Sequence, residues 1–286
     1  MSKPYIHALS SVRLDRVDPS IDRTDMNEAA KDLLQRARER TNFELLCEIG
    51  STSHGTGDGN DDFDMMGVFI ESKEQVIGQS SFDHVVMSSG DNESQNTKED
   101  ADLTLYSLRK FSKLAAAGNP SILNVFFAPM LSSTPLGLKI REAAPLFISK
   151  QAGPRYLGYM QGQMQRLKGE RSQNVKRPEL VSKYGYDTKF AYHILRLAWQ
   201  GQELMLYGKV NIPIKPHMRN FLVGVRKGEL DLPAFMERAG HEEEMLKKAI
   251  DISQLPERSD ASAIDKWLVE IHEEAWANTE EPHGKM

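Results

Sequence analysis

The stretch that decides the fold is EIGSTSHGTGDGNDDFDMMGVFIE, residues 48–71. An apolar run over 43–49 ends at a glycine and a serine, and a second apolar run covers 63–70. Between the two runs lie only Gly, Ser, Thr, His, Asn and Asp. Short apolar runs bounded by turn-forming residues are typical of buried strands. The pattern therefore predicts two strands joined by a polar loop.

Asp62 and Asp64 stand at the start of the second predicted strand, with Phe63 between them. Alternate residues of a strand point to the same face, so both carboxylates are expected on one side of the sheet. Two adjacent carboxylates repel each other unless a cation lies between them, and Mg²⁺ or Mn²⁺ prefers such hard oxygen ligands. The plainer alternative is a polar hairpin loop with solvated aspartates.

Gly50 and Ser51, where the first strand ends, suit a phosphate group. Glycine lets the backbone approach a ligand closely, and free N–H groups together with the serine hydroxyl can bond phosphate oxygens. Mg²⁺ is commonly held by one or two carboxylates together with substrate phosphates. We therefore expect Gly50 and Ser51 to bind the phosphates of a substrate beside the two aspartates.

Away from this stretch the chain divides into a strand-rich part and a helical part. From residue 154 onward the pattern indicates helices and loops without a convincing strand. This order favours an α+β fold with a mixed sheet, followed by an all-helical C-terminal domain, with the first domain at 1–140 and the second at 150–286. Further strands are predicted at 75–77, 83–87 and 101–105, and helices at 26–40, 106–117, 121–127, 188–207, 242–252 and 263–275.

Composition excludes several classes of protein. The chain has 286 residues, of which 40% are hydrophobic and 27% charged, so it can bury a sizeable core. The single cysteine, Cys47, excludes a disulfide framework and a zinc site built on several thiolates. Without an apolar run of about 18 residues we expect no membrane span. The N-terminus lacks an apolar signal core, so we expect a protein of the reducing cytoplasm.

Charge is distributed unevenly along the chain. The net charge is −5, yet residues 151–200 hold nine basic and three acidic residues. A basic stretch can bind phosphates, although a solvated surface of mixed charge explains it equally well. Residues 229–286 hold fifteen acidic and six basic residues. These acidic helices are compatible with docking of a protein partner or with a simple solvated surface.

The motifs resemble a known family. Gly-Ser, a ten-residue gap and Asp-x-Asp resemble the signature of the DNA polymerase β nucleotidyltransferase superfamily. The wider sequence is similar to one branch, the predicted RNA-ligase-associated nucleotidyltransferases, over most of residues 43–275. Two departures are visible, His54 before Gly55 and Asn60-Asp61 before Asp62. The matching segments are Glu48, Gly50, Ser51, Gly55, Asp62–Asp64, Gly67 and Val68, then 102–111, 118–120, 189–197, 225–229 and 255–256.

The resemblance implies a nucleotidyltransferase-type sheet and a third carboxylate, because two metal ions must be held and an acceptor hydroxyl activated. In the superfamily this residue lies on a later strand beside the first pair. Asp102, in the segment ADLTL, fits both the predicted strand and the family pattern. Glu99 and Asp100 are close rivals. Asp62, Asp64 and Asp102 are thus the expected catalytic residues and ligands of Mg²⁺ or Mn²⁺.

The longest predicted helix carries a second set of candidates. Lys189, His193 and Arg196 are spaced at i, i+4 and i+7, so they share one helix face. A lysine, a histidine that can carry charge and an arginine in a row can hold a triphosphate or a polynucleotide backbone. We expect the three to bind a nucleotide, although an ordinary polar helix face is the alternative.

These observations together predict a Mg²⁺-dependent transfer of a nucleoside monophosphate from an NTP to a hydroxyl. ATP is the leading nucleotide. An RNA end is the leading acceptor, because the sequence resembles RNA-ligase-associated enzymes. Transfer to a protein or a small molecule is the alternative within the enzyme class. A non-catalytic nucleotide- or RNA-binding sensor on the same fold is the alternative outside it. Base preference and oligomeric state stay open.

Overall fold

The two apolar runs around the polar loop pair with each other at the centre of a five-stranded sheet. The computed structural model describes residues 26–57, 59–79, 82–90, 97–171 and 177–280. The strand order is β3-β4-β2-β1-β5, in which only β2 and β4 are parallel. The strands are β1 (Phe43–Glu48), β2 (Phe63–Phe69), β3 (His84–Ser88), β4 (Ala101–Ser107) and β5 (Met130–Ser133).

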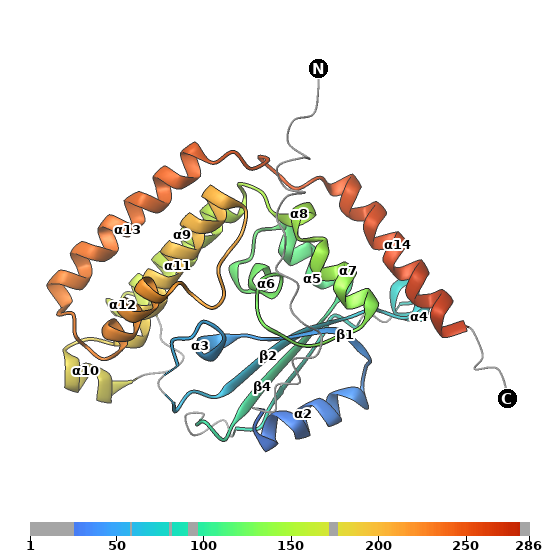
Figure 1. The fold of residues 1–286 in the computed structure, drawn as a ribbon, viewed down its shortest axis with the longest axis horizontal. Helices are drawn as coiled ribbons and strands as arrows, with labels where there is room; N and C mark the ends of the chain where they lie inside the picture. Colours follow the sequence, from blue (N-terminus) through green and yellow to red (C-terminus); the bar gives the residue numbers. More distant parts are fainter. Residues whose placement is uncertain (1–25, 58, 80–81, 91–96, 172–176, 281–286) are drawn as a thin grey trace.

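Helices cover both faces of the sheet (Figure 1). Helix α2 (Glu28–Arg38) packs below it, where Leu103 and Leu105 of β4 are fully buried against Leu33. The alternate residues of β4, beginning with Asp102, therefore face the opposite side. That side is covered by short helices, namely α5 (Leu108–Ala116), α6 (Pro120–Val125), α7 (Pro135–Glu142) and α8 (Ala144–Phe147).

A second group of helices packs around one buried helix, α11 (Thr188–Tyr207). Gly201 lets its neighbours approach, since a Cβ there would lie 2.8 Å from Leu246 and 2.9 Å from Tyr156. The 20-residue helix predicted at 188–207 is thus the core of the helical lobe. Its neighbours are α9 (Ala152–Leu167), α10 (Pro178–Tyr184), α12 (Pro216–Arg226) and α13 (Leu232–Ile252).

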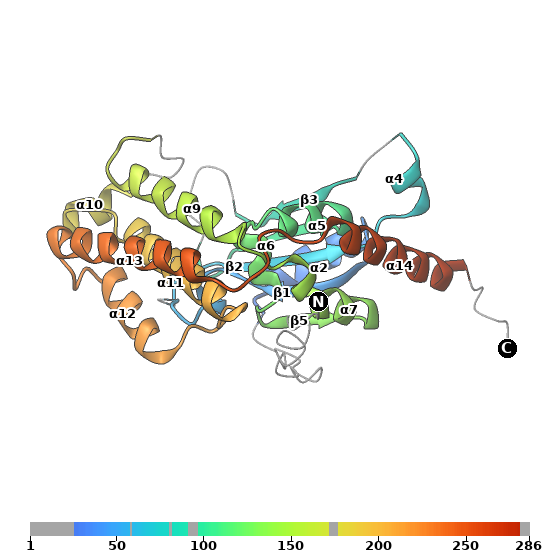
Figure 2. The ribbon, with the colours of Figure 1, turned by 90° about the horizontal axis from the view of Figure 1, so that it is seen from above.

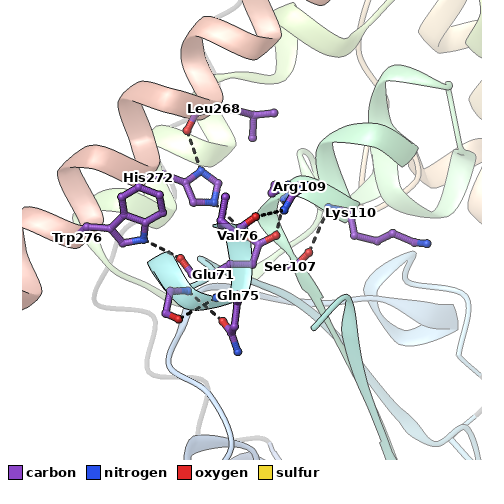
Figure 3. Close-up of polar contacts among 10 residues, drawn as sticks. Glu71, Gln75, Val76, Ser107, Arg109, Lys110, Leu268, His272 and Trp276 are labelled. Carbon is purple, nitrogen blue, oxygen red and sulfur yellow. Dashed lines mark hydrogen bonds and ion pairs between the residues drawn. The ribbon is translucent and has the colours of Figure 1, made fainter. Parts of the chain in front are cut away.

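The last helix, α14 (Ala261–Glu280), returns to the strand-rich part. Seen from above, α13 lies over the helical lobe and α14 over the strand-rich part (Figure 2). At the far end of β2 from Asp64, the Trp276 indole donates to the Glu71 carbonyl at 2.8 Å. His272 Nε2 lies 3.2 Å from the Glu71 carboxylate (Figure 3). Burial alone would raise the pKa of Glu71, but hydrogen bonds from His272 and from Ser107 outweigh it and lower this pKa.

The predicted fold class is confirmed: a mixed sheet with helices comes first, and helices are the only regular elements among the described residues after β5. The strand predicted at 75–77 is wrong. Those residues belong to the short helix α4 (Lys73–Ile77), which begins with a capping box between Ser72 and Gln75. Strand β5 was not predicted. It is four residues long and pairs with β1 at the edge of the sheet.

Two of the predicted bounds also shift at the junction of β4 and α5. The helix predicted at 106–117 begins at Leu108, because β4 continues to Ser107 and the Ser107 hydroxyl caps the helix. The division into domains at 1–140 and 150–286 stays a prediction, and residues 1–25 lie outside the described part. No helix among the described residues has the length and apolar character needed to cross a membrane.

We predict that His272→Ala destabilises the protein by about 1–3 kcal/mol, because it leaves the buried Glu71 carboxylate without one of its donors. Urea unfolding at neutral pH measures this change. The exposed His241 on α13 provides the matched control, His241→Ala, for which the free energy of unfolding should change by less than about 0.5 kcal/mol. Equal effects of the two substitutions would contradict the structural role of the pair.

Candidate functional site

Three aspartates meet on the upper face of the sheet. Asp64 on β2 and Asp102 on β4 are direct partners in the parallel ladder. Asp62 precedes Asp64 by two residues and shares its face. One carboxylate oxygen from each of the three lies within 4.8 Å of the others, and all three side chains are half-buried. The structure thus brings together the carboxylates that the sequence singled out.

The rivals of Asp102 are engaged elsewhere. The Asp100 carboxylate accepts hydrogen bonds from the Thr97 amide at 2.8 Å and from the Ser89 hydroxyl at 3.2 Å. Glu99 is exposed, and its carboxylate lies 3.9 Å from the ammonium group of Lys98. Both side chains therefore belong to the turn before β4, whereas Asp102 joins the pair on β2.

The electrostatics of the cluster favour a bound cation. Burial, then the charges of Asp62 and Asp102, raise the pKa of Asp64 from its ordinary value of 3.8 to about 7. Three carboxylates at this separation repel one another when all are ionised, which is costly at neutral pH. Oxygen ligands alone, held around one point, suit a hard divalent ion such as Mg²⁺ or Mn²⁺. The donor set therefore fits the metal that the sequence predicts.

Gly50 opens a single helical turn, α3 (Gly50–Ser53), directly against this cluster. Its φ is +79°, and a Cβ at this position would lie 2.1 Å from Asp64 Oδ2. Only glycine therefore allows the turn to approach the carboxylate. The Ile49 amide donates to the Asp64 carbonyl at 2.9 Å. Gly50 and Ser51 accordingly lie beside the aspartates.

Two of the three candidates on α11, Lys189 and His193, differ in charge. Lys189 lies close enough for its charge to oppose the rise in the pKa of Asp64. Burial first, and then the charges of Arg196 and Lys189, hold the pKa of His193 well below 6.5. His193 is therefore neutral at pH 7, so it can contribute a hydrogen bond but not the charge that the sequence analysis considered.

The third candidate, Arg196, is engaged inside the protein. Its Nη1 donates to Gln200 Oε1 at 3.0 Å and lies 3.2 Å from His54 Nε2. Its Nη2 lies 3.4 Å from His193 Nδ1. The guanidinium group therefore links α11 to the polar loop that the sequence analysis had assigned to phosphate binding.

Sequence reasoning missed further ties between the polar loop and the helical lobe. Arg226 on α12 donates to the Asp61 carboxylate at 3.0 Å and to the Thr56 carbonyl at 2.9 Å. The Thr56 hydroxyl shares a hydrogen bond of 2.7 Å with the Tyr192 hydroxyl. Arg226 lies in one of the matching segments, but no local pattern paired it with Asp61.

Comparison with known proteins agrees with this geometry. Residues 26–270 match the RNA repair pathway DNA polymerase beta family. The chain belongs to this family. Its nucleotidyltransferase fold thus carries an acidic cluster that could hold a divalent metal, in keeping with the family resemblance found in the sequence.

Two individual proteins are similar to this member of the polymerase beta family. A 38.9 kDa protein encoded between nrdC and mobD of Enterobacteria phage T4 is 32% identical over 81 residues. That match covers 28% of this chain and about a quarter, 24%, of the phage protein. A nucleotidyltransferase-like protein of Exiguobacterium sibiricum 255-15 aligns over 86% of this chain and 79% of its own, with 12% identity and a TM-score of 0.30. Similarity at this level carries no argument about the site.

We predict that Gly50→Ala weakens Mn²⁺ binding by about tenfold or more, because the new methyl group displaces Asp64. Isothermal titration with Mn²⁺ measures the affinity. Gly59 is a matched control, since its φ is +89° and nothing lies within 4 Å of a Cβ there. Gly59→Ala should reduce stability but leave Mn²⁺ affinity unchanged. Equal losses of affinity would show that backbone strain, and not contact with Asp64, is responsible.

We predict that Asp64→Asn stabilises the metal-free protein by about 1–3 kcal/mol at pH 8. The pKa of Asp64 is about 7 in the folded state and near 3.8 when unfolded, so the folded state binds more protons between these values. The wild-type protein should therefore gain stability from this group as pH falls from 8 to 5. The advantage of the variant should shrink over the same range.

Urea unfolding in EDTA at both pH values checks this prediction, with the exposed Asp251→Asn on α13 as control. Saturating Mg²⁺ should reverse the sign at pH 8, since metal binding stabilises only a chain that keeps its ligands. An Asp64→Asn variant that is less stable than wild type in EDTA at pH 8 would contradict the proposed repulsion.

Proposed function

We propose that the protein transfers a nucleoside monophosphate from an NTP to a hydroxyl acceptor and releases pyrophosphate. The observation that carries this proposal is the meeting of three aspartates beside the Gly50 turn. Membership of a polymerase beta family supports it. ATP is the leading nucleotide, and a cytoplasmic location is proposed with it.

Asp62 and Asp64 would hold both metal ions and Asp102 the one nearer the acceptor. Bound Mg²⁺ or Mn²⁺ would neutralise phosphate charge and favour the ionised acceptor hydroxyl. The acceptor oxygen would attack the α-phosphorus in line and lose its proton to solvent, and the bond from the α-phosphorus to the bridging oxygen of pyrophosphate would break. The chain's own residues position these groups and place charge where it develops.

The substrate phosphates would lie between the polar loop and α11. The Gly50 turn would bind them from the loop side together with the Ser51 hydroxyl, and Lys189 would supply a positive charge, since its charge already acts on the Asp64 carboxylate. His193 Nδ1 accepts from Arg196, so its Nε2 carries the hydrogen and can donate to a phosphate oxygen. Arg196 was also predicted to bind the nucleotide. Its contacts with His54 and Gln200 favour a different role for it in this site.

An RNA end is the leading acceptor. The family description names an RNA repair pathway, and Lys168, Arg171 and Lys183 are exposed within the basic stretch 151–200. When a polynucleotide binds to such a surface, lysine and arginine side chains displace the counterions of its phosphates. RNA affinity should therefore fall steeply with salt. A weak dependence on salt would favour a small acceptor instead.

We predict that α-labelled NTP gives metal-dependent label in RNA and that Asp62→Asn or Asp64→Asn lowers this transfer by at least about 100-fold. Each α-labelled NTP is incubated with total RNA and total protein, in Mg²⁺ or in EDTA. Asp251→Asn, which leaves the cluster intact, should transfer label at the wild-type rate. Full transfer by both cluster variants would sink the proposal.

The same experiment separates the alternatives. Label in protein in place of RNA would identify protein nucleotidylation. Tight NTP binding without label in either fraction would favour a nucleotide or RNA sensor, or a small-molecule acceptor that the mixture lacks. The labelled base would identify the preferred nucleotide.

A further inference from the structure

His54 is one of the two places where the polar loop departs from the family pattern, and it is almost fully buried, at 3% exposure. Its Nδ1 is hydrogen-bonded to the Gly50 carbonyl, and its Nε2 lies 3.2 Å from Arg196 Nη1. Because an arginine can only donate, Nε2 accepts and Nδ1 carries the hydrogen that is donated to Gly50. One imidazole ring therefore connects the helical lobe to the first residue of the turn.

The Arg196 end of this connection is held by contacts with two further residues of α11. Arg196 projects from α11, the buried centre of the helical lobe, and its Nη1 also donates to Gln200 Oε1 at 3.0 Å. His193 Nδ1 lies 3.4 Å from its Nη2. Both terminal nitrogens of the guanidinium group thus have partners within the protein, so Arg196 is anchored at a defined place behind the loop.

The Gly50 end of the connection bears directly on the metal cluster. The Cα of Gly50 is packed against the Asp64 carboxylate so closely that no Cβ fits between them. The Ile214 amide donates to the His54 carbonyl at 3.1 Å and fixes the backbone of the histidine itself. The His54 ring is thus bonded to the same residue that packs against the Asp64 carboxylate, which couples the position of the ring to that of the metal cluster.

The histidine also stays in one charge state. Burial first, and then the charge of Arg196, lower the pKa of His54 to about 3. The ring is consequently neutral throughout the pH range in which the protein would work. Nδ1 therefore remains the donor and Nε2 the acceptor. Arg196 shares a helix face with Lys189 and His193, and its guanidinium group contacts His54.

We propose that His54 is a positioning residue, and that Arg196 acts on the metal and phosphate site through His54 and not by binding the nucleotide. This proposal rests on the proposed function only for the identity of the ligands, a metal ion and a nucleotide. The link from Arg196 through His54 to Gly50 aligns the turn with Asp64. Outer residues that orient metal ligands typically change metal affinity or activity by about 10–100-fold when they are replaced.

A double-mutant cycle tests this proposal. His54→Phe keeps a ring but loses both hydrogen bonds, and Arg196→Met keeps most of the packing but loses the donor. The readouts are the Mn²⁺ dissociation constant, the NTP dissociation constant with Mn²⁺, amide hydrogen exchange over residues 50–56, and kcat and KM for label transfer. His241→Phe, on the exposed surface of α13, is the matched control.

Each single substitution should weaken Mn²⁺ binding by about tenfold and speed exchange over 50–56, with kcat affected more than KM. The double variant should be no worse than either single one, because both remove the same link. His54→Asn retains a donor toward Gly50 but cannot reach Arg196, so it should lie between wild type and His54→Phe. It also replaces the phenylalanine variant in the cycle if that variant does not fold.

Two results would overturn the proposal. If Arg196→Met weakens NTP binding as much in the His54→Phe background as in wild type, Arg196 binds the nucleotide directly. If the His54 variants keep wild-type Mn²⁺ affinity and hydrogen exchange, the link does not position the turn. A wild-type protein that transfers no label would refute the proposed function alone, since metal binding and exchange still decide the role of His54.

Discussion

Repulsion among three carboxylates is the constraint on which the rest of the structure depends. Asp64 and Asp102 are fixed as neighbours by the parallel pairing of β2 and β4, and Asp62 joins them on the same face. The strands cannot separate to relieve this repulsion, because apolar side chains bury the sheet from both sides. The folded protein therefore stores an electrostatic cost that a divalent cation can remove, which makes cation binding favourable.

The helical lobe supplies the positive charge that such a site requires, and it does so from inside the protein. Lys189 opposes the charge of the cluster, Arg226 pairs with Asp61, and Arg196 holds His54. Part of the basic stretch noticed in the sequence is thus used to position the polar loop. The exposed remainder of that stretch is the surface that a polynucleotide could contact. The packing of the helical lobe against the polar loop therefore both offsets the charge of the aspartate cluster and positions the loop.

Local signals were sufficient for much of the fold. The helix at 188–207 agrees with the structure at both ends, because the Asp187 side chain caps its start and Gly208, in a left-handed conformation, ends it. The strands around the polar loop were also predicted from short apolar runs and turn residues. The error at 75–77 arose because a capping box over Ser72 and Gln75 outweighs two apolar residues in so short a segment. Strand β5 is defined by its pairing with β1, which no local pattern reveals.

The sequence by itself determined the type of site: a Gly-Ser turn, an Asp-x-Asp pair and a family resemblance that implied a third carboxylate. Tertiary structure decided which carboxylate that is, because in the parallel register Asp102 faces Asp64 while Asp100 is bonded in the preceding turn. It also brought together His54 and Arg196, which are 142 residues apart in the chain. Spacing along one helix shows which residues share a face, but only packing shows what that face meets.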